Sequence, residues 1–135
     1  MYVKNHMLPK HKLTTLCLNE SIGSALKKIE DGDFLSLPVF EGEEFKGILM
    51  KEAIYRNYFE KYNDDREKFL SDVKVRDLYS ENYKSIKEDE LIENASYLLK
   101  ELRTPFLPVF NFKNEFVGIL THFSIFNAFS EVFGF

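Results

Sequence analysis

Two stretches of this sequence repeat each other: residues 37–49 read LPVFEGEEFKGIL, and residues 107–120 read LPVFNFKNEFVGIL. Leu37 and Leu107 lie 70 positions apart, and the second stretch is one residue longer than the first. The extra residue falls between two apolar runs, where a loop is expected and length varies freely. The chain is therefore an internal duplication, and each copy is too small to bury its apolar residues without the other.

The composition predicts a soluble globular protein. The chain has 135 residues, of which 44% are hydrophobic and 30% are charged, and this length supports one core shared by both copies. The net charge is -4 and no basic stripe is present, which disfavours nucleic-acid binding. A single cysteine, Cys17, together with the lack of a signal peptide or a long apolar run, predicts a cytoplasmic protein with no membrane segment.

Each copy is predicted to contain a strand, a helix, a hairpin of two strands and a second helix. Short apolar runs bounded by turn residues indicate the strands, and apolar residues that recur every three to four positions indicate the helices. Asn19 and Asp89 are the expected N-caps of the first helix in each copy. The expected elements are strand 13–18, helix 20–29, strands 34–40 and 45–49 and helix 51–62 in the first copy, and strand 84–86, helix 91–102, strands 106–110 and 116–120 and helix 122–133 in the second.

The predicted fold class is α/β (α+β), built from tandem β-α-β-β-α repeats. Residues 1–70 are expected to form repeat 1, with an extended terminal helix and a linker, and residues 71–135 are expected to form repeat 2. Pro38 has no backbone N–H to donate, so its strand is predicted to lie at an edge or to be locally irregular. The charged segment 63–68 is predicted to be a helix end followed by a solvated linker.

This order of elements, the tandem copies, the Leu-Pro-Val motif before each hairpin and the Gly-Ile-Leu strand end before each helix resemble the cystathionine β-synthase-type (CBS) domain. The paired arrangement of the family is called a Bateman module, and it occurs in stand-alone bacterial proteins. The resemblance covers nearly the whole chain. It implies two α/β units related by a pseudo-two-fold axis, with two clefts between them. In the family such clefts hold AMP, ADP, ATP, S-adenosylmethionine or cyclic di-AMP, and the modules are sensors that signal to partner proteins, not catalysts.

In the nucleotide-binding copies of the family, the junction between strand and helix reads Gly, two apolar residues, Ser or Thr, two variable residues and Asp. The hydroxyl caps the helix and meets phosphate, while the carboxylate accepts the ribose hydroxyls. Repeat 1 has Met50 and Ala53 at these two polar positions, whereas repeat 2 has Thr121 and Ser124. Repeat 2 is therefore the better candidate, although replacing Asp by Ser is expected to weaken binding about ten- to a hundred-fold.

The resemblance implies further ligand-binding residues. Lys51 and His122 fall in the first helical turn, where the family often places a base that meets phosphate, and the alternative for each is a side chain that faces solvent. For Thr121 the alternative is a plain N-cap. The cleft walls are expected to come from Thr15, Leu16, Leu35, Leu37 and Pro38 in repeat 1 and from Ile86, Thr104, Phe106, Leu107 and Pro108 in repeat 2.

Neither a metal site nor catalysis is predicted. His6, His11 and His122 do not fit a zinc-binding spacing, and no compact acidic cluster suits magnesium or calcium. The sequence contains no nucleophile elbow, no P-loop and no identifiable pair of catalytic carboxylates. No cofactor is expected to be required, and the only small molecule implied is an adenine-containing nucleotide.

The aromatic residues predict an interface. The chain has 14 Phe and 7 Tyr, and residues 122–133 are apolar around more than one helix face, whereas one face suffices to pack on a single sheet. We expect a homodimer in which helices 51–62 and 122–133 pack across a two-fold axis. The orientation of the two copies is left open by the sequence.

Two functions remain open. The first is a dimeric sensor that binds an adenine nucleotide in the cleft lined by Thr121 and signals to an unidentified protein partner. The second is a dimeric adaptor that has lost ligand binding. Met50, Ala53 and Ser124 favour the adaptor, whereas Thr121 and Lys51 favour the sensor.

Overall fold

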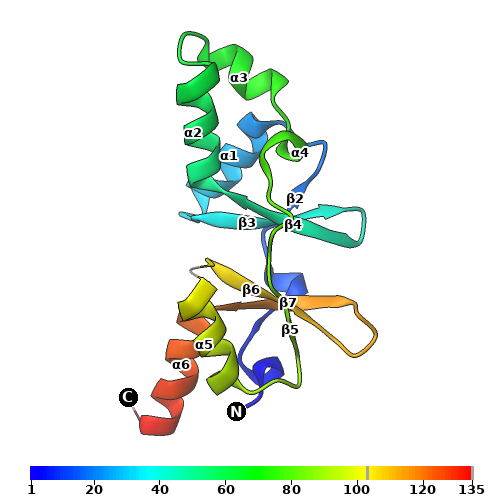
Figure 1. The fold of residues 1–135 in the computed structure, drawn as a ribbon, viewed down its shortest axis with the longest axis vertical. Helices are drawn as coiled ribbons and strands as arrows, with labels where there is room; N and C mark the ends of the chain where they lie inside the picture. The colour runs from blue at the N-terminus through cyan, green and yellow to red at the C-terminus, as the bar shows by residue number, and fades with distance from the viewer. Residues whose placement is uncertain (103, 135) are drawn as a thin grey trace. The chain divides into compact units, whose positions relative to one another are not determined.

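The computed structural model describes residues 1–102 and 104–134, and they fall into two compact units (Figure 1). The continuous unit is Thr14–Asn82, and the split unit combines Met1–Leu13 with Tyr83–Phe135. Each unit contains one β-α-β-β-α succession, as predicted. The chain is therefore a mixed α/β protein with two sheets.

The continuous unit is built on a three-stranded sheet with the order β2-β3-β4. Strand β2 is parallel to β3, and β3 is antiparallel to β4. Apolar residues of the sheet and of helices α1, α2 and α3 form one core, in which Leu16, Ile22 and Leu49 are fully buried. The elements are β2 (Leu16–Cys17), α1 (Ile22–Asp31), β3 (Ser36–Glu41), β4 (Glu44–Met50), α2 (Lys51–Lys61), α3 (Arg66–Asp72) and α4 (Val75–Leu78).

The split unit is built on a four-stranded sheet with the order β1-β7-β6-β5. Strands β5 and β6 are parallel, and the other neighbours are antiparallel. Its core contains Val3, Ile92 and Leu120, all fully buried. The elements are η1 (Val3–Asn5), β1 (Leu8–Pro9), η2 (Lys10–Lys12), β5 (Ile86–Lys87), α5 (Ile92–Leu102), β6 (Phe106–Phe110), β7 (Phe116–Thr121) and α6 (His122–Phe133).

The segment that leads into each repeat packs on the other repeat. The Val3 N–H donates to the Glu90 carbonyl at 2.9 Å, and the Val75 N–H donates to the Glu20 carbonyl at the same distance. Both valines are fully buried. The packing units therefore do not divide between residues 70 and 71, the boundary expected from the repeats, because the chain up to Asn82 completes the core of the continuous unit.

The repeated glycine of the Gly-Ile-Leu motif lets this exchanged segment approach the sheet. A Cβ atom at Gly47 would lie 2.1 Å from the Ser80 carbonyl oxygen, and one at Gly118 would lie 2.3 Å from the Leu8 carbonyl oxygen. The Ile48 N–H donates to the Ser80 carbonyl at 3.0 Å, and the Ser80 N–H donates to the Ile48 carbonyl at 2.8 Å. Only glycine leaves room for backbone this close.

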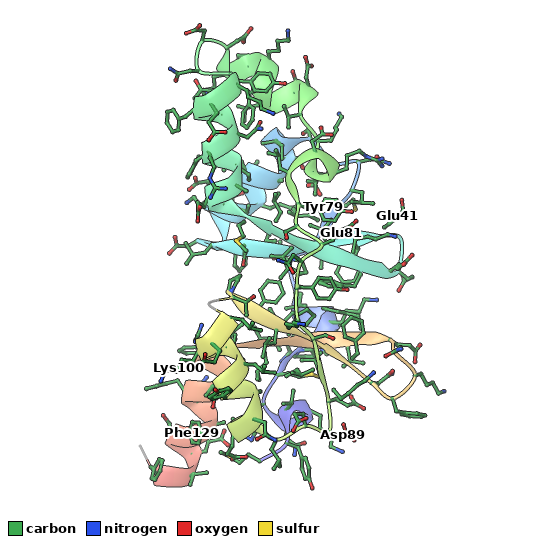
Figure 2. All side chains as sticks on the ribbon, viewed as in Figure 1. Glu41, Tyr79, Glu81, Asp89, Lys100 and Phe129 are labelled. Carbon is green, nitrogen blue, oxygen red and sulfur yellow. The ribbon has the colours of Figure 1, made fainter. Side chains whose placement is uncertain are left out.

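The N-caps predicted for the first helix of each repeat were wrong. Helix α1 is capped by Ser21, whose hydroxyl accepts the Ser24 N–H at 3.1 Å, and Asn19 lies two residues too early. Helix α5 begins at Ile92, so Asp89 lies in the preceding loop, too far upstream to cap it (Figure 2). An N-cap must directly precede the first helical residue for its side chain to reach the free N–H groups.

The strand that contains Pro38 lies at the centre of its sheet, not at an edge, although it is irregular as predicted. β2 pairs only with Val39 and Phe40, so no ladder bond to Pro38 is required. The segment 63–68 also does more than link, because α3 begins within it. The Asp65 carboxylate caps α3 by accepting the Lys68 N–H at 3.0 Å.

Candidate functional site

The junction between β7 and α6 in repeat 2 is closed by a reciprocal cap. The Ser124 N–H donates to Thr121 Oγ1 at 3.0 Å, and the Thr121 N–H donates to Ser124 Oγ at 3.4 Å. The two hydroxyl oxygens lie 3.0 Å apart. Ser124 is only 5% exposed. The cap offered as the alternative role of Thr121 is therefore present, and the ligand contact of both hydroxyls stays a prediction.

The neighbours of this cap come from the paired strand. Phe106 lies opposite Thr121 in the β6–β7 register, and the Thr104 hydroxyl donates to the Phe106 carbonyl at 2.9 Å. His122 is exposed as the first residue of α6. Thr104, Phe106 and Thr121 are thus brought together at the N-terminus of a 12-residue helix, whose unpaired N–H groups and dipole favour an anion.

The junction between β4 and α2 in repeat 1 is different. Met50 provides no side-chain cap for α2. Lys51 Nζ lies 3.3 Å from Glu30 Oε2, and the Tyr55 hydroxyl donates to Glu30 Oε1 at 2.6 Å. The Lys51 N–H donates to the Leu35 carbonyl at 2.9 Å. The base predicted to meet phosphate therefore has a carboxylate partner within its own unit.

The pKa values of these three groups follow from their contacts. The hydrogen bond from Tyr55, and then that from Lys51, hold the pKa of Glu30 below its ordinary value. Partial desolvation of Lys51 opposes its ionisation, but the bond and the charge of Glu30 outweigh it and raise the pKa. The bond to Glu30 also raises the pKa of Tyr55. At neutral pH the Lys51 charge is thus matched by that of Glu30.

The predicted wall residues lie in two kinds of environment. Several are core residues of their own unit, and Thr15 offers its carbonyl to Lys28 Nζ at 3.0 Å. Leu35 differs because it is 78% exposed, which is unusual for leucine. The buried members are Leu16, Leu37 and Pro38 in the continuous unit and Ile86, Phe106, Leu107 and Pro108 in the split unit.

Sequence reasoning missed Glu30 and Tyr55. Tyr55 falls within the predicted helix 51–62 but was not singled out, and Glu30 lies 21 positions before Lys51. No local spacing signals that pair, since it forms only when α1 packs beside α2.

Within residues 1–102 and 104–134, no three side chains of His, Cys, Asp or Glu come together as a metal-binding group. Across the same described residues, no helix is both long enough and apolar enough to span a bilayer.

Comparison with known proteins identifies the fold. Residues 75–131 match the CBS domain family, whereas no curated protein sequence matches the chain. A hypothetical conserved protein from Geobacillus kaustophilus aligns with a TM-score of 0.84 and 19% identity over 97% of each chain. CBSX2 from Arabidopsis thaliana, solved in complex with AMP, aligns with a TM-score of 0.80 and 22% identity over 97% of each chain.

A further similar structure is CbpB in complex with c-di-AMP. It aligns with a TM-score of 0.79 and 16% identity over 99% of this chain and 87% of CbpB. At such identities the similarity is one of fold. Residues 75–131 match the CBS domain family, and the two repeats together have the fold of the similar CBS-domain structures.

Proposed function

We propose that this protein is a regulatory module, not a catalyst, and that it binds an adenine nucleotide at the β7–α6 junction of repeat 2. One observation carries the choice of repeat: the hydroxyls of Thr121 and Thr104 and the backbone of Phe106 lie together at the N-terminus of α6, whose first turn has no acidic residue. Solved CBS-domain proteins with this fold include complexes with AMP and with c-di-AMP, which supports the choice of nucleotide.

Repeat 1 is the weaker candidate on electrostatic grounds. A phosphate that approached the N-terminus of α2 would compete with Glu30 for Lys51, since the two side chains lie 3.3 Å apart. Repulsion from the carboxylate would offset part of the attraction to the helix N-terminus. The proposed ligand therefore binds first in repeat 2, and its signal passes to a separate protein partner.

A panel of AMP, ADP, ATP, S-adenosylmethionine, NAD and cyclic di-AMP tests this proposal by thermal unfolding. A ligand at a hundred times its Kd stabilises the folded protein by about 2.7 kcal/mol, which raises the Tm by several degrees. If no member of the panel raises the Tm, the sensor proposal fails. The ligand-free adaptor then becomes the better account, and the mutual cap of Thr121 and Ser124 already favours it.

Variants of the two junctions locate the site once a ligand is found. Thr121→Val is expected to reduce the ligand-induced rise in Tm more than Met50→Thr changes it. Because Thr121→Val also removes a helix cap, each rise is measured from the variant's own Tm without ligand. Thr121→Ser keeps the hydroxyl and is expected to preserve binding. A larger effect of Met50→Thr would place the site in repeat 1.

We further propose that the protein is a homodimer formed through helices 51–62 and 122–133. Phe123 and Phe126 on α6 are 70% and 65% exposed, and Phe59 on α2 is 66% exposed. Apolar surface of this extent is characteristic of an interface. Sedimentation at micromolar concentration is expected to give twice the 15.9 kDa of one chain, and a single 15.9 kDa species would contradict this.

A further inference from the structure

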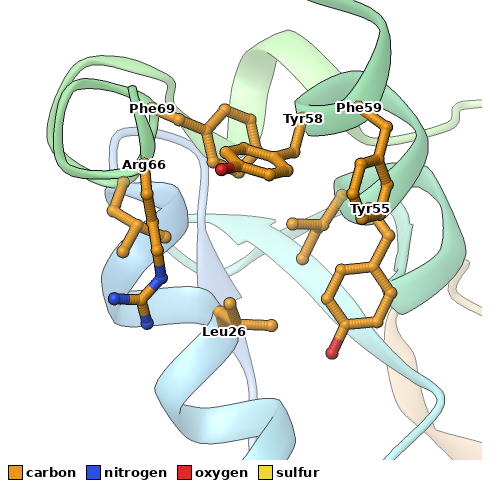
Figure 3. Close-up of a pocket in the computed structure, with 8 residues that line it drawn as sticks. Leu26, Tyr55, Tyr58, Phe59, Arg66 and Phe69 are labelled. Atoms are coloured by element: carbon orange, nitrogen blue, oxygen red, sulfur yellow. The ribbon is translucent and has the colours of Figure 1, made fainter. Parts of the chain in front are cut away.

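Helices α1, α2 and α3 of the continuous unit surround an apolar hollow of about 160 Å³ (Figure 3). Leu26 of α1 lines it together with three rings of α2, those of Tyr55, Tyr58 and Phe59. Arg66 of α3 lies across the hollow from Tyr55 and Phe59. All the residues that line it belong to one unit of one chain, so the hollow is separate from the β7–α6 junction of repeat 2.

The walls of the hollow are held in place before any ligand arrives. A Cβ atom at Gly23 would lie 3.0 Å from the Leu70 carbonyl oxygen, so glycine at this place on α1 allows the close approach of α3. Phe69 also lines the hollow, is 2% exposed, and has its ring 5.2 Å from the Tyr58 ring. A wall formed in advance spares a ligand the cost of ordering it.

The apolar hollow adjoins a second, charged hollow of about 220 Å³. Leu26, Arg66 and Leu70 line both of them, and Lys27 and Glu30 line the second one as well. Arg66 is the charged side chain that the two hollows share. A ligand that fits them therefore has an apolar end and a polar end that meet beside Arg66.

The charged groups of the second hollow differ in how firmly they are paired. Glu30 is held by the two contacts described above, and Lys27 Nζ donates to Asp31 Oδ2 at 2.9 Å. Arg66 Nη1 lies 3.8 Å from Glu67 Oε1, beyond hydrogen-bond distance, and both side chains are largely exposed. An ion pair of this kind contributes little. The Arg66 guanidinium can therefore turn to a ligand carboxylate and hold it with two parallel hydrogen bonds.

The apolar hollow has the size and the surroundings of an aromatic ring. A dry apolar cavity of about 150 Å³ accepts benzene in a protein core, so about 160 Å³ suits a phenyl group. The Tyr58 and Phe59 rings already meet edge to face at 5.3 Å, and a further ring beside them gains the same kind of contact. It would also cover part of Phe59, which is 66% exposed.

The charges favour a singly charged polar end. Glu30 lines the charged hollow, and its low pKa keeps it ionised at neutral pH. It therefore repels a phosphate dianion about twice as strongly as a carboxylate at the same distance. A carboxylate matches the planar donors of Arg66 and carries the smaller repulsion.

We propose that the continuous unit binds a small monocarboxylic acid with a benzene-sized apolar group: the ring occupies the apolar hollow, and Arg66 pairs with the carboxylate. The site lies within one copy and does not require the homodimer proposed above. It is also independent of the proposed nucleotide site, because Thr104 and Thr121 belong to the split unit. Failure of either proposal leaves the other standing.

Titration of the isotope-labelled full chain with hydrocinnamate, followed by NMR, tests the site. This probe is a phenyl ring joined to a carboxylate by two methylene groups. It is expected to shift the amide signals of α1, α2 and α3 in a saturable way, with a Kd of about 1 mM or lower, which a ligand of this size can reach. Acetate, which lacks the ring, is expected to give no saturable shift. No saturable shift with hydrocinnamate up to about 10 mM, or shifts confined to the split unit, would overturn the site.

A charge variant tests the pairing with the carboxylate. Arg66→Gln is expected to raise the Kd of hydrocinnamate about fivefold, as loss of an exposed ion pair allows, and to leave the Kd of the neutral hydrocinnamamide unchanged. Lys68→Gln is the matched control, because it removes the same charge from α3 and lines neither hollow. Equal weakening by the two variants would indicate general attraction of anions and overturn the role of Arg66.

A ring variant tests the apolar hollow. Phe59→Ala removes an exposed ring from its wall and is expected to raise the Kd of both probes about threefold or more, the effect of one aromatic contact. Phe112→Ala is the control, because Phe112 is 86% exposed on the β6–β7 hairpin, and it is expected to leave both Kd values unchanged. Equal effects of Phe59→Ala and Phe112→Ala would overturn the placement of the ring.

Discussion

Gly47 and Gly118 show how a single residue type permits one contact in both repeats. In each case the side-chain position is occupied by the carbonyl oxygen of the exchanged segment, Ser80 in one unit and Leu8 in the other. The neighbour is backbone held in a bridge, so it cannot rotate aside as a flexible side chain could. The glycine is therefore required by packing, whatever the ligand.

Alanine at either glycine is expected to lower the free energy of unfolding by about 1 to 3 kcal/mol, the range for an overpacked core. Urea unfolding followed by circular dichroism measures the loss. Gly42→Asn is the control, since Gly42 has φ +59° and nothing within 4 Å of its missing Cβ, and asparagine tolerates that conformation. The control is expected to be nearly neutral. A neutral Gly118→Ala would contradict the steric argument.

At the scale of single elements, the start of α1 is organised by Glu20. Its carboxylate accepts the Cys17 N–H at 3.1 Å and the Ser24 hydroxyl at 2.5 Å, and it lies 3.0 Å from Lys28 Nζ. Partial burial raises the pKa of Glu20, but the bonds from Ser24, Cys17 and Lys28 outweigh it and hold the pKa below 4.5. The ionised form is therefore stabilised by folding.

This shift predicts a pH dependence of stability. A carboxyl whose pKa is lower in the folded state contributes stability above the unfolded pKa, near 4.5, and loses it as the pH falls through the folded pKa. Glu20→Gln is expected to cost about 1 kcal/mol at pH 7, and the difference from wild type should shrink below pH 4.5. Urea unfolding across this range measures it, with the exposed Glu101→Gln as control. A difference that stayed constant with pH would contradict the role of the charge.

The elements also show what could be predicted from sequence. Strand β6 and helix α6 begin and end where predicted, because the apolar run around Pro108 and the hydroxyl of Thr121 are local signals. The start of α1 was missed because Asn19 and Ser21 are both suitable caps, and tertiary contacts of the intervening turn decide between them. The pairing of Lys51 with Glu30 depends on helix packing, which no local pattern encodes.

At the scale of the whole molecule, the two units are linked by the exchange of their leading segments. The Ile92 N–H donates to the Met1 carbonyl at 2.9 Å, and the Ile22 N–H donates to the Val73 carbonyl at 2.8 Å. Val3 precedes repeat 1 in the sequence but is fully buried in the core that contains repeat 2. Val75 precedes repeat 2 but is fully buried in the core that contains repeat 1. Each repeat therefore depends on a segment that precedes the other.

This exchange predicts that a mutation in a leading segment destabilises the repeat on which that segment packs, not the repeat that follows it in the sequence. Val3→Ala removes buried methyl groups from the split unit at a cost of about 2 kcal/mol, and it is expected to speed amide hydrogen exchange in α5, including Ile92, more than in α1. Val75→Ala is expected to have the opposite pattern, with faster exchange at Ile22. The two variants control for each other, since they remove the same atoms. Equal acceleration of α1 and α5 in both variants would show that the units open together, and acceleration confined to the adjacent repeat would contradict the exchange.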